Sequence, residues 1–150
     1  EHIEWLGSTV EGGVKLSELS RYLGRPRRLK AAMYAIEEYE RGLSRAILAG
    51  IGDIPGLSEM PHVKVYGLTN LGRLAERDPT FSFEVKGLTN KEVVERLWSK
   101  YSIALRSENF YSRVHEVYDA PEMIRASFVH YNTIEEARTL LSALNEMKPR

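Results

Sequence analysis

The clearest candidate for a functional residue in the sequence is Arg125, which lies inside a predicted strand. The alternate neighbours of Arg125 are apolar: Ile124, Ala126 and Phe128. Successive side chains of a strand point to opposite faces, so Arg125 shares its face with Ser127. If that face lines a cleft, the planar guanidinium can grip a carboxylate through two parallel hydrogen bonds. If the face is open to solvent, Arg125 is an ordinary surface charge.

A second arginine raises the same question. Arg106 ends the apolar run 103–105 and precedes a polar loop at 107–113. Two arginines at the ends of adjacent strands would form a local anion site even in a chain with no net charge. Ion pairs with Glu108 or Glu122 are the alternative, and the spacing alone leaves both open.

Several other chemical motifs are missing from the sequence. The chain has no cysteine, which excludes disulfides, thiolate metal sites and a thiol nucleophile supplied by this chain. The four histidines are scattered and lack the spacing of a metal site, so we expect no metal. Neither the glycine-rich phosphate loops nor the Gly-x-Ser-x-Gly elbow occurs.

The composition is that of a folded protein. Hydrophobic residues make up 43% and charged residues 28% of the 150 positions, which excludes wholesale disorder. The 21 basic and 21 acidic residues cancel, so we expect neither nucleic acid nor a membrane as partner. No apolar run approaches the ~18–20 residues that span a bilayer, and no signal peptide opens the chain, so we expect a cytoplasmic location.

One basic cluster stands out against this balance, at residues 25–30. It could bind an anion or nucleic acid, or it could be the solvated start of the next helix. No aromatic residues are interleaved with the charges, which favours the solvated helix start.

Hydrophobic spacing predicts the elements that must hold the two arginines. A helical pattern runs from Arg27 to about Leu48, after a shorter helix around residues 16–23. Alternation predicts four strands, at 62–66, 81–85, 102–106 and 123–129.

Two capping boxes open further helices, one from Thr89 to Glu92 and one from Thr133 to Glu136. The order is therefore long helix, two strands, helix, two strands, helix. It predicts an α+β fold: a small, mainly antiparallel sheet of about four strands with helices packed on one face, preceded by the long helix and an irregular N-terminal arm.

The segment 124–136 has a residue order typical of one family. Arg125, Ala126 and Ser127 are followed by an aromatic stretch and by Tyr-Asn-Thr at 131–133, before the last helix. In this it resembles the class V aminotransferases, fold-type I pyridoxal 5′-phosphate enzymes that include cysteine desulfurases and selenocysteine lyases. Weaker resemblances follow the same order at residues 1–6, 32–44, 54–56, 63–67, 81–87 and 103–106.

The resemblance implies an enzyme that acts on an amino acid, with pyridoxal phosphate as the electron sink. The family's arginine at the position of Arg125 binds the substrate carboxylate, and the one at Arg106 lies beside the active-site loop. Two departures imply that this chain is inactive alone. Tyr111 takes the place of the desulfurase cysteine, and a phenol cannot carry a persulfide. No lysine occurs in the Ser-x-His-Lys context that supplies the family's Schiff base.

These features predict residues 28–150 as the C-terminal small domain, and residues 1–27 as an arm or linker from a missing large cofactor-binding domain. The parent would be a homodimeric lyase or transferase that holds the cofactor, with none bound to this chain alone. The start at Glu1, inside a helix-like segment, indicates a fragment or a processed product. A stand-alone, non-catalytic interaction domain and an unrelated α+β binding module are the alternatives.

Overall fold

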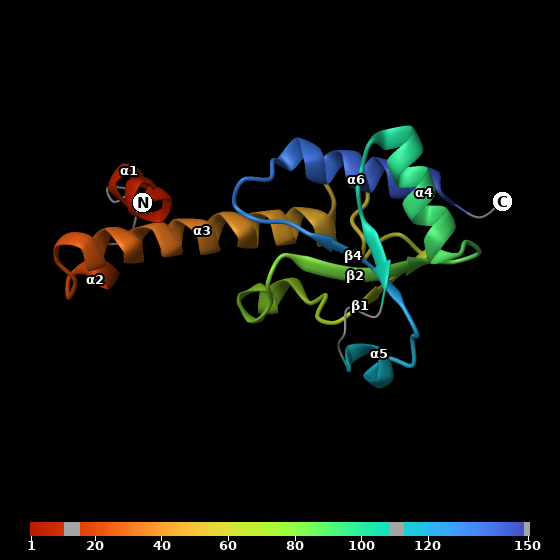
Figure 1. Ribbon diagram of the computed structural model, residues 1–150, viewed down its shortest axis with the longest axis horizontal. Helices are drawn as coiled ribbons and strands as arrows, with labels where there is room; N and C mark the ends of the chain where they lie inside the picture. The colour runs from red at the N-terminus through yellow and green to blue at the C-terminus, as the bar shows by residue number, and fades with distance from the viewer. Residues whose placement is uncertain (11–15, 109–112, 149–150) are drawn as a thin grey trace.

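The computed structural model describes residues 1–10, 16–108 and 113–148. The molecule is elongated, with a sheet and its covering helices at one end and a helical arm at the other (Figure 1). The sheet has four strands, all antiparallel, so the predicted α+β class is confirmed.

The strands are β1 (Val63–Tyr66), β2 (Thr80–Val85), β3 (Arg106–Glu108) and β4 (Met123–Ser127). Their order in the sheet is β1-β2-β4-β3, so β4 lies between β2 and β3. Phe81, Phe83 and Ile124 are fully buried on one face, because apolar residues recur at every second position of β2 and β4. The opposite face is more polar and carries Arg125.

Three helices cover the apolar face: α3 (Gly24–Ala49), α4 (Asn90–Tyr101) and α6 (Ile134–Glu146). Both predicted capping boxes are confirmed. The Thr89 hydroxyl accepts from the backbone N–H of Glu92 at 3.2 Å, and the Glu92 carboxylate accepts from the N–H of Thr89 at 2.8 Å. The box that opens α6 has the same reciprocal pair of bonds. Each box therefore fixes where its helix begins.

The predicted strand at 102–106 is wrong. Helix α4 ends with Ser102 in the left-handed conformation (φ 56°), and residues 102–105 then run outside any strand. Ile103 and Leu105 are half-buried and pack against the core, so their alternation reflects packing rather than strand pairing. Between this segment and the end of β4 lies a hollow of about 330 Å³. Strand β3 therefore starts only at Arg106.

The arm consists of α1 (His2–Val10), α2 (Leu16–Leu19) and the first half of α3. Helix α3 has 26 residues and begins at Gly24, three residues before the predicted start. A helix of this length measures about 39 Å, so it reaches well beyond the sheet (Figure 1).

The basic cluster at 25–30 holds the arm together. The Glu4 carboxylate accepts hydrogen bonds from Arg25 at 3.1 Å and from Arg28 at 2.6 Å. The Arg27 guanidinium donates to the backbone carbonyl of Leu19 at 3.2 Å. These arginines therefore join α1 and α2 to α3. The cluster lies at the start of the helix, as the sequence favoured, but three of its side chains also make contacts within the arm.

Two short helices were not predicted, η2 (Leu71–Glu76) and α5 (Val114–Val117). The segment after α5 lies against the polar face of the sheet, on the side away from α6 (Figure 1). There Ala120 and Met123 bury Tyr66, and the Tyr118 ring lies 5.3 Å from the Tyr66 ring. None of the described helices is long and apolar enough to cross a membrane.

Candidate anion-binding site

The two arginines singled out from the sequence lie next to each other on the polar face of the sheet. Arg106 of β3 pairs with Arg125 of β4 in the antiparallel ladder. Paired residues point to the same face with Cβ atoms about 4.5–5.5 Å apart. The burial pattern confirms that Arg125 and Ser127 share the exposed face, while Ile124 and Ala126 are buried on the other.

The row continues across the sheet. Arg125 pairs on its other side with Ser82 of β2, and Ser82 pairs with Tyr66 of β1. Tyr66, Ser82, Arg125 and Arg106 therefore form one line of side chains across the four strands. Two cations and a hydroxyl are adjacent in this line, and all of them can donate hydrogen bonds.

The acids beside the row neutralise it only in part. The Glu108 carboxylate is 3.9 Å from the Arg106 guanidinium, and the Arg106 side chain remains 81% exposed. Glu122 accepts a hydrogen bond from the Ser107 hydroxyl at 3.0 Å. The sequence left open whether an ion pair neutralises Arg106. Among the described residues the ion pair with Glu108 is a long one, so Arg106 keeps much of its positive charge.

A hollow of about 480 Å³ lies between α4 and β3 and meets this row at Arg106. Arg106 and Glu108 line it from the strand, and Lys91 and Glu95 line it from the helix. Its volume would accommodate a small organic molecule.

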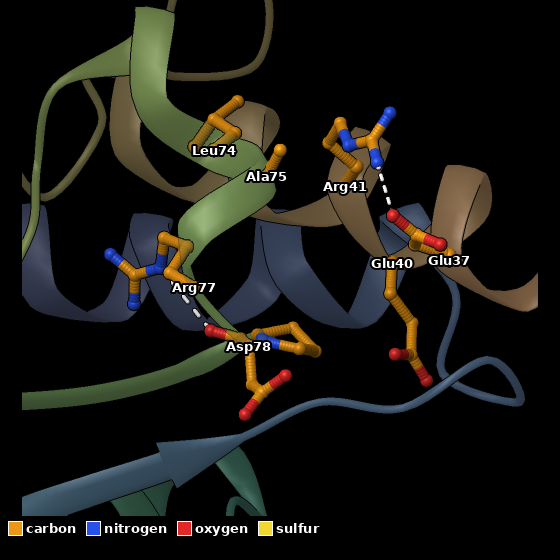
Figure 2. Close-up of a pocket in the computed structure, with 8 residues that line it drawn as sticks. Glu37, Glu40, Arg41, Leu74, Ala75, Arg77 and Asp78 are labelled. Atoms are coloured by element: carbon orange, nitrogen blue, oxygen red, sulfur yellow. Dashed lines mark hydrogen bonds and ion pairs between the residues drawn. The ribbon is translucent and has the colours of Figure 1, made fainter.

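A separate, smaller hollow of about 150 Å³ lies between α3 and η2 (Figure 2). Arg41 forms an ion pair with Glu37 at 2.5 Å, and the half-buried Arg77 donates to the backbone carbonyl oxygen of Thr80 at 2.7 Å. Desolvation lowers the pKa of Arg77, and its guanidinium lies 4.2 Å above the Phe81 ring. This hollow is part of the scaffold that joins η2 to α3.

The fold agrees with a comparison to protein families. The family model described as "Aminotransferase class-V" matches residues 28–140, which includes both arginines. The chain belongs to the class V aminotransferase family. The resemblance seen in the segment 124–136 is therefore confirmed.

Individual relatives give the same picture. An aminotransferase-like protein of Gibberella zeae is 30% identical over 148 residues, which is 96% of this chain and 35% of that protein. The apo structure of a cysteine desulfurase from Thermococcus onnurineus superimposes with a TM-score of 0.64 at 27% identity, over 83% of this chain and 30% of that one.

A cysteine desulfurase from Escherichia coli has the same fold, with a TM-score of 0.58 at 21% identity over 80% of this chain and 29% of that one. This chain therefore spans about a third of the length of the relatives it matches.

Class V aminotransferases use pyridoxal 5′-phosphate, which an unprotonated lysine holds as a Schiff base. The lysines in the described part of the chain do not fit that role, since none is buried. Lys86 donates to the carbonyl of Pro61 at 2.7 Å, and Lys64 pairs with Glu84 at 3.3 Å. The hydrogen bond that Lys100 donates to the Glu146 carboxylate raises the pKa of Lys100 above its ordinary value and keeps it charged. None of the described lysines therefore has the buried setting expected of a Schiff-base lysine.

Two positions complete the comparison with the sequence. Tyr111, at the place of the desulfurase cysteine, lies outside the described residues. Ser82 was not singled out from the sequence, although the alternation Phe81-Ser82-Phe83 places it on the polar face. Only the register with β4 shows that it lies beside Arg125.

Proposed function

We propose that this chain is the C-terminal, carboxylate-binding domain of a pyridoxal-phosphate enzyme of the class V aminotransferase family, related to cysteine desulfurases. The single observation that carries the proposal is the pairing of Arg106 with Arg125 on the polar face of the sheet. Arg125 would bind the α-carboxylate of an amino-acid substrate, and Arg106 would add a second cation beside it.

Physical chemistry supports a bound anion at this place. Like charges directly opposite each other in a sheet repel. A carboxylate between the two guanidinium groups would turn that repulsion into two attractive contacts. The planar guanidinium also fixes the orientation of the carboxylate through paired hydrogen bonds.

The rest of the enzyme would supply the cofactor. We propose that residues 28–150 form the small domain, and that residues 1–27 lead from a large domain that binds pyridoxal phosphate. On this proposal the chain alone neither holds the cofactor covalently nor turns over substrate, and the parent is a homodimer. The 35% of the Gibberella zeae protein that this chain spans is consistent with such a parent.

An NMR titration of the ¹⁵N-labelled chain with L-alanine tests the carboxylate site. We expect saturable shifts of the amides of β4, and no shifts with L-alaninamide, which lacks the carboxylate. Arg125→Gln should abolish the shifts, and Arg106→Gln should weaken binding. Arg138→Gln removes an exposed arginine from α6, on the far side of the sheet, and should leave binding unchanged.

Two results would contradict the proposal. Binding that persists in Arg125→Gln would place the carboxylate elsewhere. A chain that binds no carboxylate would favour the alternative of a non-catalytic interaction domain. A separate check is borohydride reduction after mixing with pyridoxal phosphate, since a trapped adduct on a specific lysine of this chain would contradict the assignment of the cofactor to another domain.

A further inference from the structure

The hydroxyl of Ser82 occupies a distinctive position on the polar face of β2. The three outward residues of this strand are Thr80, Ser82 and Glu84. The Thr80 hydroxyl donates to the Ser127 hydroxyl at 3.2 Å. The Glu84 carboxylate pairs with Lys64 at 3.3 Å. Each of these two side chains thus binds the residue that faces it on the neighbouring strand.

Ser82 breaks this pattern. It faces Arg125 on one side and Tyr66 on the other, and its hydroxyl makes no hydrogen bond to another residue of the described part of the chain. Arginine offers only donors, so it cannot accept the proton of the hydroxyl. The half-buried Ser82 hydroxyl is thus a donor beside Arg125 that no described residue engages.

Within the row, a ligand can approach Ser82 from the side of Arg125, which is exposed. Tyr66 closes the row on the β1 side, because it is buried beneath Tyr118 and Ala120. The nearest acid along β2 is Glu84, which Lys64 engages. The charges beyond Arg125 are Arg106 and its distant partner Glu108. A carboxylate held by Arg125 would thus meet the Ser82 hydroxyl on the neighbouring strand.

We propose that Ser82 is a third ligand-binding residue, which donates a hydrogen bond to the carboxylate that Arg125 grips. This inference rests on the proposed function and deepens it. An ionised carboxylate has about four lone-pair sites, of which one guanidinium occupies two. The Ser82 hydroxyl, one strand away, takes a further site and fixes which side of the carboxylate faces β1.

The arrangement also defines the ligand's direction. The Tyr66–Tyr118 pair blocks the row on the β1 side, so the ligand's remaining atoms extend toward β3 or away from the sheet. Ser82 therefore acts on affinity and on orientation, and Arg125 supplies the charge.

The test repeats the L-alanine titration on four variants of the full chain. Ser82→Ala should raise the dissociation constant about five- to tenfold, and Ser82→Thr, which keeps the hydroxyl, should restore it to within about twofold of the unmodified chain. Ser127→Ala is the matched control, since it removes a hydroxyl from the same face that already binds Thr80, and it should change the constant less than twofold. Arg125→Gln reports on the proposed function itself.

The outcomes separate the two proposals. If Arg125→Gln abolishes binding while Ser82→Ala binds as the unmodified chain does, the role of Ser82 is overturned and the carboxylate site stands. If Ser82→Ala and Ser127→Ala weaken binding equally, the effect of Ser82 is a general loss of strand packing and the inference fails. If the unmodified chain shows no binding that depends on Arg125, the proposed function falls and the role of Ser82 falls with it. Thermal melts of each variant confirm that the comparison is made between folded proteins.

Discussion

Arg106 and Arg125 face each other across the β3–β4 ladder, two like charges on adjacent strands of one exposed face. Such pairs are unfavourable in a sheet, and the acid closest to Arg106 among the described residues, Glu108, is 3.9 Å away. On the proposed function, a carboxylate bound between the two guanidinium groups would relieve this repulsion. A site that binds substrate often has this property, because it is shaped for the ligand rather than for stability.

The repulsion can be measured through salt. We expect Arg106→Gln to raise the free energy of unfolding by a few tenths of a kcal/mol at ~0.01 M salt, where the Debye length is about 30 Å. At ~1 M salt the gain should disappear. Urea unfolding at the two salt concentrations gives the comparison. Arg73→Gln is the control, since it breaks an ion pair with Glu76 at 2.5 Å and should lower stability at low salt. A loss of equal size in both variants would show that Arg106 is not repelled.

Substitution by alanine should have opposite effects on stability at two glycines, Gly7 in α1 and Gly42 in α3. A Cβ atom on Gly7 would lie 1.9 Å from the backbone carbonyl oxygen of Arg28, so Gly7→Ala should displace α1 at a cost of about 1–3 kcal/mol. Gly42, inside α3, has nothing within 4 Å of that position, so Gly42→Ala should stabilise the chain by about 0.5–1 kcal/mol. Hydrogen exchange should accelerate in α1 of Gly7→Ala and remain slow in the sheet. Unchanged exchange in α1 would mean that the helices are not in contact.

The capping box of α6 makes stability depend on pH. The backbone N–H of Thr133 and the amide of Asn132 hold the pKa of Glu136 below its ordinary value of 4.5. The folded state therefore favours the ionised form, and this contribution is present above pH about 4.5 and lost as the pH falls through the lower native pKa. We expect Glu136→Gln to flatten this acidic limb in unfolding experiments. Glu135→Gln controls for the loss of one charge, and an equal flattening there would contradict the assignment.

The loop between β4 and α6 is tied to the long helix. The Tyr39 hydroxyl donates to the carbonyl of Asn132 at 2.7 Å, and the Glu40 carboxylate accepts from the N–H of His130 at 3.0 Å. Tyr39→Phe should cost about 0.5–1.5 kcal/mol and speed hydrogen exchange in the loop. The exposed Tyr131→Phe should change neither quantity. Slow exchange in both variants would show that the contact with α3 does not order the loop.

The sequence was most informative where a pattern is local. The Thr-x-x-Glu spacing at 89–92 and 133–136 predicted two helix starts, because the cap bonds join residues three apart. Alternation in β4 placed Arg125 on the polar face for the same reason. The family resemblance rested on a short segment and was confirmed over residues 28–140.

Predictions failed where the outcome depends on distant residues. Ile103 and Leu105 alternate as in a strand, yet they pack against the core without pairing with β4. The position of Ser82 beside Arg125 depends on a register between strands that are far apart in the sequence, which no local pattern contains. For Arg106, the sequence raised the possibility of two arginines at the ends of adjacent strands, and the sheet order shows that Arg106 and Arg125 pair.

One unbroken helix, α3, belongs both to the sheet end of the molecule and to the arm (Figure 1). Any small tilt of its inner half against the sheet is magnified at its outer half: a tilt of about 10° would swing a tip ~20 Å away by about 3–4 Å. The loop that follows β4 is hydrogen-bonded to α3 through Tyr39 and Glu40. In a longer protein, a domain that binds the arm would therefore be able to shift β4, the strand that carries Arg125.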